Sequence, residues 1–501
     1  MKKKKTKQSS GLRSTSEMGF PSSHTLKWLL IVLLMYFGLR LIFFAVTISP
    51  YVPPDEVTHF GIARVYSEVP FLPENLPKTY QYGLVTNIPY LYYWVMGKLL
   101  AVNIFNIPDL IFLRLLNILF AFATIYFVWR MLRLLTDDRL TQLLLVVTMT
   151  NTIMFSFLSA SVSYDNMTNL LAAMAVYYLL AFFKHRSGNM LAASILCQLA
   201  GSLTKTTFLP LVLVMNILLL IHEFRNLRAI PSALKDYIHA SGKCGLSLMF
   251  AILVGLSLNI QLYGGNIVHY RNLVPGMSKV LSPEIAMQNR IYARNMIFTD
   301  FKEERISLDK ALEMASHINH DGDRRDTIKL IENYMANKYR GVSLLNPLEY
   351  IVPWSLHMMA TIFGILGHFR MLNKGPTIMP FFALMMLTGL GILIRWRARE
   401  AGGLPTFLAV IAVFYGIFLM YAVNYQIYLK YEVVHLVVQG RYIFPVIGPI
   451  YVLSCYYLLR LFEGRYTRLG VFVATALIFV AFDLPYFIIR ATPKWFAIPL
   501  N

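Results

Sequence analysis

The sequence predicts an all-α polytopic membrane protein, and three observations favour this class. Of the 501 residues, 57% are hydrophobic and only 14% are charged, and the mean hydropathy is +0.54. The apolar residues gather in runs of roughly 20, the length a helix needs to cross a bilayer. The short segments between these runs are basic, as cytoplasmic loops are. The net charge of +20 therefore reflects membrane topology, and no nucleic-acid partner is expected.

Residues 1–27 contain KKKK and a Ser/Thr-rich stretch, which predict a disordered basic tail on the cytoplasmic side. Residues 28–501 are predicted to form one transmembrane domain with about eleven spanning helices. These helices are expected at residues 28–48, 110–135, 141–158, 168–183, 190–203, 207–221, 244–262, 376–394, 404–427, 441–460 and 469–489. Two further apolar stretches, 88–102 and 351–369, are interpreted as helices on or dipping into the outer face, and the total becomes about 13 if both span.

Charge asymmetry predicts the orientation of the chain in the cell membrane. With the N-terminus inside, the basic short loops, including 222–243, fall on the cytoplasmic side, and the C-terminus lies outside. Two large loops, 49–109 and 263–375, are then extracytoplasmic. The sequence of the second loop predicts two polar amphipathic helices around a solvated turn, HDGDRRD. This loop is the expected lid or acceptor-recognition surface.

The first outer loop opens with YVPPDEVTHF, directly after the first apolar run. The two prolines favour an extended path, and a helix can begin next, with Asp55 near its N-terminus. Asp55 and His59 then share one helix face, because they lie four residues apart, and Glu56 follows Asp55 directly. A helix cap with solvated charges explains the same residues equally well.

Five more ionisable residues lie in or beside apolar runs, where charge is costly and usually functional. All five fall on the predicted outer side: Arg40, Arg114, Asp165, Lys205 and Arg441. Arg40 is close enough to its helix end to snorkel to the headgroups, and Arg114 beside Asp109 fits an interfacial anchor. Lys205 and Arg441 have no acidic neighbour in sequence and could together bind a phosphate anion.

An outer cavity with a carboxylate and deeper cations suits a lipid-phosphate glycosyltransferase. The carboxylate takes a proton from the attacking acceptor hydroxyl, and the cations stabilise the leaving phosphate. No G-x-G-x-x-G strand-helix unit is present, so a lipid-linked donor is expected. Two alternatives remain open. One is a polysaccharide polymerase or ligase acting on lipid-diphosphate glycans. The other is a lipid or sugar transporter (flippase), which would show an internal repeat.

Four segments, PPDEVTHF, NIPYLYYWV, ATIFGILGHF and VVQGRYIFP, resemble those of the bacterial membrane-protein family named domain of unknown function 2142. That family is similar to the GT-C superfamily of polytopic glycosyltransferases. The resemblance implies an inverting enzyme that moves a sugar from a polyprenyl-phosphate-linked donor to an extracytoplasmic glycan or cell-envelope polymer. The sequence departs from the family where NIPYLYY lacks one proline and IFGILGHF has Gly and His in place of tryptophans.

The resemblance also assigns roles to residues. Asp55 takes the place of the first-loop acidic residue, Arg114 that of the arginine that opens the second helix, and Asp165 that of an aspartate in the second outer loop. Asp55 and Glu56 are the candidate catalytic residues. Residues implied in substrate binding are His59, Arg114, Asp165, Lys205, Gln439, Arg441 and Tyr442. Lys205 and Arg441 match in position and kind only. Some GT-C enzymes use a divalent metal, for which Asp55, Glu56 and His59 are the candidate ligands here.

Overall fold

The computed structural model describes residues 22–50, 52–104, 106–224, 242–318, 320–365, 375–398 and 400–497. These residues form helices and no strand, apart from an isolated antiparallel bridge between Ile48 and Phe496. The predicted all-α class is therefore confirmed. Among the described residues, eight helical segments are long and apolar enough to cross a membrane, or nine if one bent pair counts as a span.

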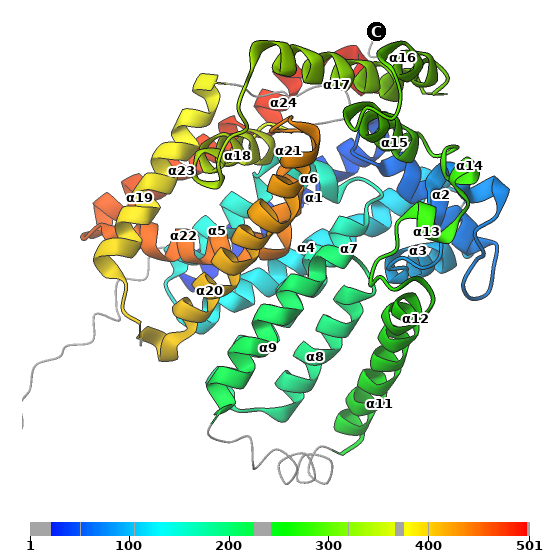
Figure 1. Ribbon diagram of the computed structural model, residues 1–501. Coiled ribbons are helices and arrows are strands. Elements are labelled where there is room, and N and C mark those ends of the chain that lie inside the picture. The colour runs from blue at the N-terminus through cyan, green and yellow to red at the C-terminus, as the bar shows by residue number, and fades with distance from the viewer. Residues whose placement is uncertain are drawn as a thin grey trace, which may run out of the picture.

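The spanning segments are single helices or helices joined end to end (Figure 1). They are α1 (Ser23–Thr47), α4 (Asp109–Leu135), α7 (Tyr164–His185), η2 with α9 (Thr206–Phe208, Leu209–Glu223), α11 with η4 and α12 (Gly242–Asn259, Ile260–Gly264, Gly265–Tyr270), η6 with α20, η7 and α21 (Glu400–Gly403, Leu404–Ile417, Phe418–Tyr425, Gln426–Tyr431), η8 with α22 (Gly440–Val446, Ile447–Leu461), and α23 with α24 (Arg465–Ala481, Leu484–Arg490).

The remaining elements are shorter or bent. They are α2 (Glu56–Ser67), η1 (Pro77–Tyr82), α3 (Leu91–Leu100), α5 (Arg139–Thr150), α6 (Ile153–Ser159), α8 (Gly188–Ser202), α13 (Met277–Val280), α14 (Pro283–Ala286), α15 (Arg290–Lys302), α16 (Leu308–Ser316), α17 (Asp321–Arg340), α18 (Pro347–Ile362), η5 (Gly375–Ile378), α19 (Met379–Arg395) and η9 (Pro493–Trp495). Neither α3 nor α18, the two outer-face candidates, has the length of a span.

The predicted count of about eleven spans is not reached. Helix α8 has 15 residues and α19 has 17, although α8 still packs beside α7 and α11 in the bundle (Figure 1). The predicted span 141–158 is the bent pair of α5 and α6, whose axes differ by 63°. The bend lies at Asn151, whose side-chain amide donates to the carbonyl of Val147 at 2.8 Å. Such local bonds compete with the helix ladder and favour a break.

Two further boundaries differ from the sequence predictions. The described tail residues from Ser23 to Lys27 are helical and belong to α1; residues 1–21 and most of the loop 222–243 lie outside the described ranges. The described part of the segment 263–375 contains the helices α12 to α18 and not two, and α15, α16 and α17 pack with Tyr431 of α21 in a small core. HDGDRRD is the start of α17 and not a turn, because His320 caps that helix by accepting from the backbone N–H of Asp323 at 3.3 Å.

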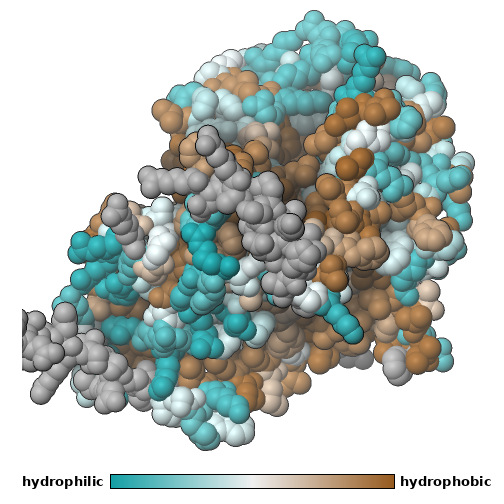
Figure 2. Space-filling model, turned by 90° about the horizontal axis from the view of Figure 1, so that it is seen from below, coloured by the Kyte–Doolittle hydropathy of each residue, from teal (hydrophilic) through white to brown (hydrophobic). Residues whose placement is uncertain are grey.

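The helix bundle exposes a broad apolar surface. Seen from below, hydrophobic residues cover much of the right and lower parts of the molecule, and hydrophilic ones gather at the left and along the top (Figure 2). On three different helices, Leu39 is 67% exposed, Phe250 70% and Leu393 83%. Lipid tails can cover such residues at no cost, whereas water cannot. The surface therefore supports a bilayer environment.

An ion pair lies inside the bundle at two helix breaks. Arg40 of α1 pairs with Asp483, which sits between α23 and α24, and both side chains are buried. Arg40 also donates to the Thr150 carbonyl and, at 2.9 Å, to the Ser156 hydroxyl. Arg40 thereby forms hydrogen bonds with polar groups that the bend between α5 and α6 leaves without a partner in the helix. The snorkelling interpretation of Arg40 is wrong.

This pair gives a stability prediction. We expect Arg40→Ala to lower the free energy of unfolding by about 3–5 kcal/mol, because it leaves Asp483 as a buried unpaired charge. The double variant Arg40→Met/Asp483→Leu is expected to recover much of that loss. Melting of the purified protein in detergent measures both changes. Lys78→Ala, which breaks an exposed pair with Glu68, is the control and should change little; equal melting of Arg40→Ala and wild type would contradict the prediction.

Candidate functional site

The candidate site begins where the chain leaves α1 and turns into α2. Asp55 occupies the residue before α2 with φ 58° and ψ 8°, a left-handed conformation that Asp tolerates better than most residues. Its side chain makes no helix-capping hydrogen bond. It instead accepts from Nη2 of Arg441 at 2.5 Å. The interpretation of Asp55 as a helix cap is therefore wrong.

Glu56 and Arg114 form a closed, buried pair next to Asp55. Arg114 donates from Nε and Nη2 to the two carboxylate oxygens of Glu56, at 2.8 and 2.5 Å. Its remaining nitrogen donates to the carbonyls of Ala45 and Ile48 at the end of α1, at 2.9 and 2.7 Å. Burial raises the pKa of Glu56, and the Arg114 charge opposes that rise. The pair joins α1, α2 and α4.

Four charged residues from distant parts of the chain meet beside this pair. Asp165, in the first turn of α7, contacts Nζ of Lys205 and lies 3.4 Å from Nη1 of Arg441. Arg441, at the start of η8, reaches Asp55 with its other terminal nitrogen. Two positive and two negative charges therefore balance within one cluster. Asp165, Lys205 and Arg441 are almost completely buried, whereas the Asp55 side chain is 34% exposed.

Aromatic and amide groups hold the two cations in place. Nζ of Lys205 lies 4.6 Å from the Tyr164 ring centre and 4.9 Å from that of Tyr442, distances at which a cation is attracted to a ring face. Gln439 accepts from Nε of Arg441 at 2.7 Å. Arg441 therefore uses all three of its nitrogens, with Nη1 also 3.4 Å from the Pro54 carbonyl.

His59 lies on the same side of α2 as Asp55 and is buried. Its Nδ1 is 2.8 Å from the hydroxyl of Tyr93, and its ring packs 4.4 Å from that of Tyr164. Nε2 is buried and has no hydrogen-bond partner among the described residues. Burial lowers the pKa of His59 to about 4, against the opposing charges of Asp55 and Asp165. The imidazole is therefore neutral at pH 7 and has one nitrogen free to bind a ligand.

The candidate metal ligands do not fit a metal ion. Within the described ranges, no three His, Cys, Asp or Glu side chains gather closely enough to hold one. Glu56 is committed to Arg114 through both carboxylate oxygens, and Asp55 faces Arg441. The hypothesis of a site built from Asp55, Glu56 and His59 is not supported by their arrangement.

The structure thus divides the residues that the sequence singled out. It brings together Asp55, His59, Asp165, Lys205, Gln439, Arg441 and Tyr442. It sets Glu56 and Arg114 apart as a closed pair, and Arg40 elsewhere in the bundle. Sequence reasoning missed Tyr93 and Tyr164; their signals were NIPYLYYWV and the tyrosine directly before Asp165.

The fold and this cluster define a helical membrane protein of several spans with a buried charge network at one end of its bundle. No protein-family model matches the chain, and no curated protein matches it. The resemblance to the GT-C superfamily therefore stays an expectation.

The burial of His59 predicts a pH dependence of stability. The pKa is near 6.5 in the unfolded chain and about 4 in the folded one, so between these values the unfolded state binds more protons and acidification destabilises the fold. Each pH unit in this window should cost about 1.4 kcal/mol. Melting temperatures measured from pH 7 to pH 4 should fall less steeply for His59→Asn than for the wild type. Parallel curves would contradict the burial of a neutral His59.

Proposed function

We propose that this protein is a membrane glycosyltransferase that moves a sugar from a polyprenyl-phosphate-linked donor to an extracytoplasmic acceptor of the cell envelope. The observation that supports it best is the contact between Asp55 and Arg441. It joins a partly exposed carboxylate to the buried Arg441, which Asp165 links to a second buried cation, Lys205. A transfer from a lipid phosphate needs a base and an anion site at adjacent positions.

The chemistry follows from these groups. The acceptor hydroxyl oxygen attacks the anomeric carbon of the donor and inverts it, while its proton passes to the carboxylate of Asp55. The bond between the anomeric carbon and the phosphate oxygen breaks, and the electron pair leaves with the polyprenyl phosphate. Arg441 and Lys205 stabilise the charge that develops on that oxygen. Asp165 positions both cations and takes no proton.

Binding of the donor would release the carboxylate of Asp55, the proposed base, from its contact with Arg441. In the structure Asp55 contacts Arg441, and the charges of Asp55, Asp165, Lys205 and Arg441 sum to zero. Asp165 is 3% exposed and shared by two cations, whereas Asp55 is 34% exposed and has the easier path to solvent. A donor phosphate would therefore displace Asp55 from Arg441 and meet a net positive site. The freed carboxylate then lies beside the bound donor, where the acceptor must arrive.

His59 adds a neutral contact. Burial raises the pKa of Tyr93 well above its usual value, so its hydroxyl keeps its proton and can donate to Nδ1 of His59. Nε2 then carries the imidazole proton. We assign this N–H to an oxygen of the donor, because it has no partner among the described residues.

A lipid or sugar transporter is the alternative from another class of proteins. Two observations favour this alternative: the bent pair of helices α5 and α6, and the Arg40–Asp483 ion pair beside it. Broken helices and charges within the membrane are typical of transport pathways. Purified protein in detergent distinguishes the two functions. A transferase makes a glycosidic product there, and a transporter makes none.

The role of Asp55 gives the first functional prediction. Asp55→Asn keeps the shape of the side chain and removes its charge, so radiolabelled sugar transfer should fall about 10²- to 10⁴-fold while donor binding persists. Glu68→Gln at the end of the same helix, a 58% exposed carboxylate, is the matched control. Wild-type turnover by folded Asp55→Asn would refute the assignment.

The cations give a second prediction. Arg441→Gln should weaken binding of a polyprenyl-phosphate sugar about tenfold to a hundredfold, because one charged hydrogen bond is worth about 1.5–3 kcal/mol. Arg441→Lys keeps the charge and loses the planar fork, so it should recover binding only in part. Equilibrium binding of labelled donor measures both. Unchanged affinity in folded Arg441→Gln would show that the phosphate lies elsewhere.

A further inference from the structure

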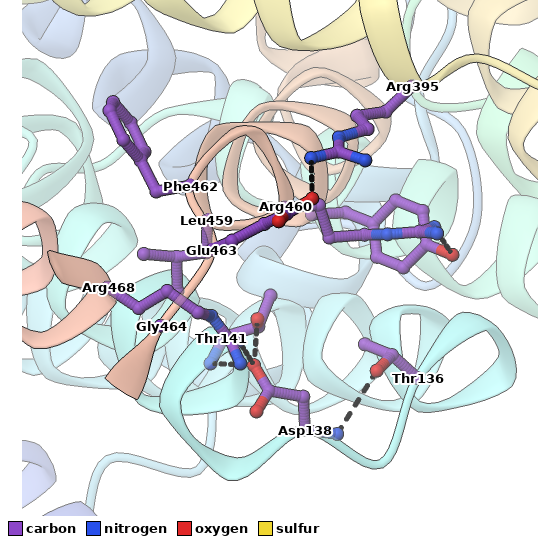
Figure 3. A pocket seen from close by; sticks show the side chains of 11 residues that line it. Thr136, Asp138, Thr141, Arg395, Leu459, Arg460, Phe462, Glu463, Gly464 and Arg468 are labelled. Atoms are coloured by element: carbon purple, nitrogen blue, oxygen red, sulfur yellow. Dashed lines mark hydrogen bonds and ion pairs between the residues drawn. The ribbon is translucent and has the colours of Figure 1, made fainter. Parts of the chain in front are cut away.

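A polar pocket lies at the far end of the span that carries Arg441. It has a volume of about 450 Å³ and is formed where α5 begins, α19 and α22 end and α23 begins (Figure 3). Arg441 opens the segment Gly440–Leu461 and Arg460 nearly closes it, which separates the two sites by roughly 30 Å at 1.5 Å per residue. That distance is about the thickness of the hydrocarbon core. In a bilayer that this span crosses, the pocket lies at headgroup depth in the leaflet opposite the charge cluster.

Three ion pairs line or border this pocket. Arg395 contacts Glu463 at 2.6 Å, Arg468 contacts Asp138 at 2.6 Å, and Arg460 contacts Glu400 (Figure 3 draws the pocket-lining residues). The first two pairs are partly open to solvent, since their side chains are between 31% and 83% exposed.

Each of these pairs is a single-point contact. Arg395 uses only Nη2 and meets only Oε1 of Glu463, and Arg468 uses only Nη2 and meets only Oδ2 of Asp138. Among the described residues, the other terminal nitrogen of each arginine and the other oxygen of each carboxylate have no hydrogen-bond partner. The pocket therefore combines unused donors with unused acceptors.

We propose that this pocket binds the headgroup of a phospholipid that carries both a phosphodiester and a primary ammonium, as phosphatidylethanolamine does. The phosphate accepts from the unused nitrogens of Arg395 and Arg468, and the ammonium donates to the unused oxygens of Glu463 and Asp138. Leu459 and Phe462 form an apolar part of the lining, which suits the glycerol and upper acyl chains.

Charge complementarity selects this headgroup over a purely anionic one. Counting the three arginines with Asp138, Glu463 and Glu400, the charges around the pocket cancel. A phosphate alone would leave the carboxylates competing for the arginines, whereas a zwitterion offers a partner to each sign. Phosphatidylcholine has the same net charge but no N–H donor, so it cannot bind the carboxylates by hydrogen bonds.

Lipid binding to the purified full-length chain tests the proposal. After delipidation in detergent, native mass spectrometry with added dioleoyl phosphatidylethanolamine, phosphatidylglycerol or phosphatidylcholine gives the three affinities. We expect phosphatidylethanolamine to bind about tenfold more tightly than phosphatidylcholine, the equivalent of one charged hydrogen bond. Equal affinities, or tighter binding of phosphatidylglycerol, would overturn the zwitterion site.

Two variants locate the site. Glu463→Gln should weaken phosphatidylethanolamine about tenfold and leave phosphatidylglycerol unchanged, whereas Arg395→Gln should weaken both lipids. Both residues form an exposed pair, so the fold should persist, and a melting curve checks this. Arg305→Gln, an exposed arginine among the helices of the second outer loop, is the matched control. Wild-type affinities in both folded variants, or an equal loss in Arg305→Gln, would overturn the assignment.

Discussion

The buried pair of Glu56 and Arg114 fixes the geometry on which the candidate site depends. Its hydrogen bonds reach the end of α1 through Ala45 and Ile48 and the segment before α7 through the backbone N–H of Val162, at 2.9 Å from Glu56. The residue before Glu56 is Asp55, and Asp165 follows three residues after Val162. One bidentate contact thus sets the positions of both carboxylates of the cluster. A buried pair of this kind stabilises only when its hydrogen bonds are complete, and here both oxygens of Glu56 are engaged.

The two aspartates of the cluster face the same arginine and differ in how firmly they are held. Asp165 is buried between Lys205 and Arg441, so its removal would leave two desolvated cations. Asp55 meets Arg441 with a side chain that is 34% exposed, and its backbone holds a left-handed conformation that costs about 1–3 kcal/mol. Strain of this kind persists only where neighbouring structure enforces it, and the Asp55 side chain makes no capping hydrogen bond to α2. Of the two aspartates, Asp55 is therefore the more exposed partner of Arg441.

The sequence predicted the fold class and most of the cluster, because apolar runs and charges within them are local signals. Lys205 and Arg441 stood out since neither has an acidic neighbour in sequence; their partners come from Asp165 and from Asp55, which lies 386 residues before Arg441. No local signal could pair Arg40 with Asp483, so Arg40 was misread as snorkelling. In the sequence, Glu56 and Asp55 are both candidate catalytic carboxylates. Only the position of Arg114 shows that Glu56 lies in a closed ion pair and Asp55 does not. The bend at Asn151 had a signal in the polar run TMTNT, which a hydropathy average conceals.

The pair of Glu56 and Arg114 and the pairs Arg395–Glu463 and Arg468–Asp138 differ in the number of hydrogen bonds that they leave unused. Glu56 and Arg114 meet through two parallel bonds, in a place that water does not reach. The pairs Arg395–Glu463 and Arg468–Asp138 meet through one bond each at a partly open helix end. Glu56 and Arg114 satisfy each other's donors and acceptors, which avoids the desolvation penalty of an unmet buried group. A pair at an open end keeps spare groups at little cost, because water satisfies them until a ligand replaces it. The same chemical groups therefore serve as a structural joint in one place and as a binding surface in the other.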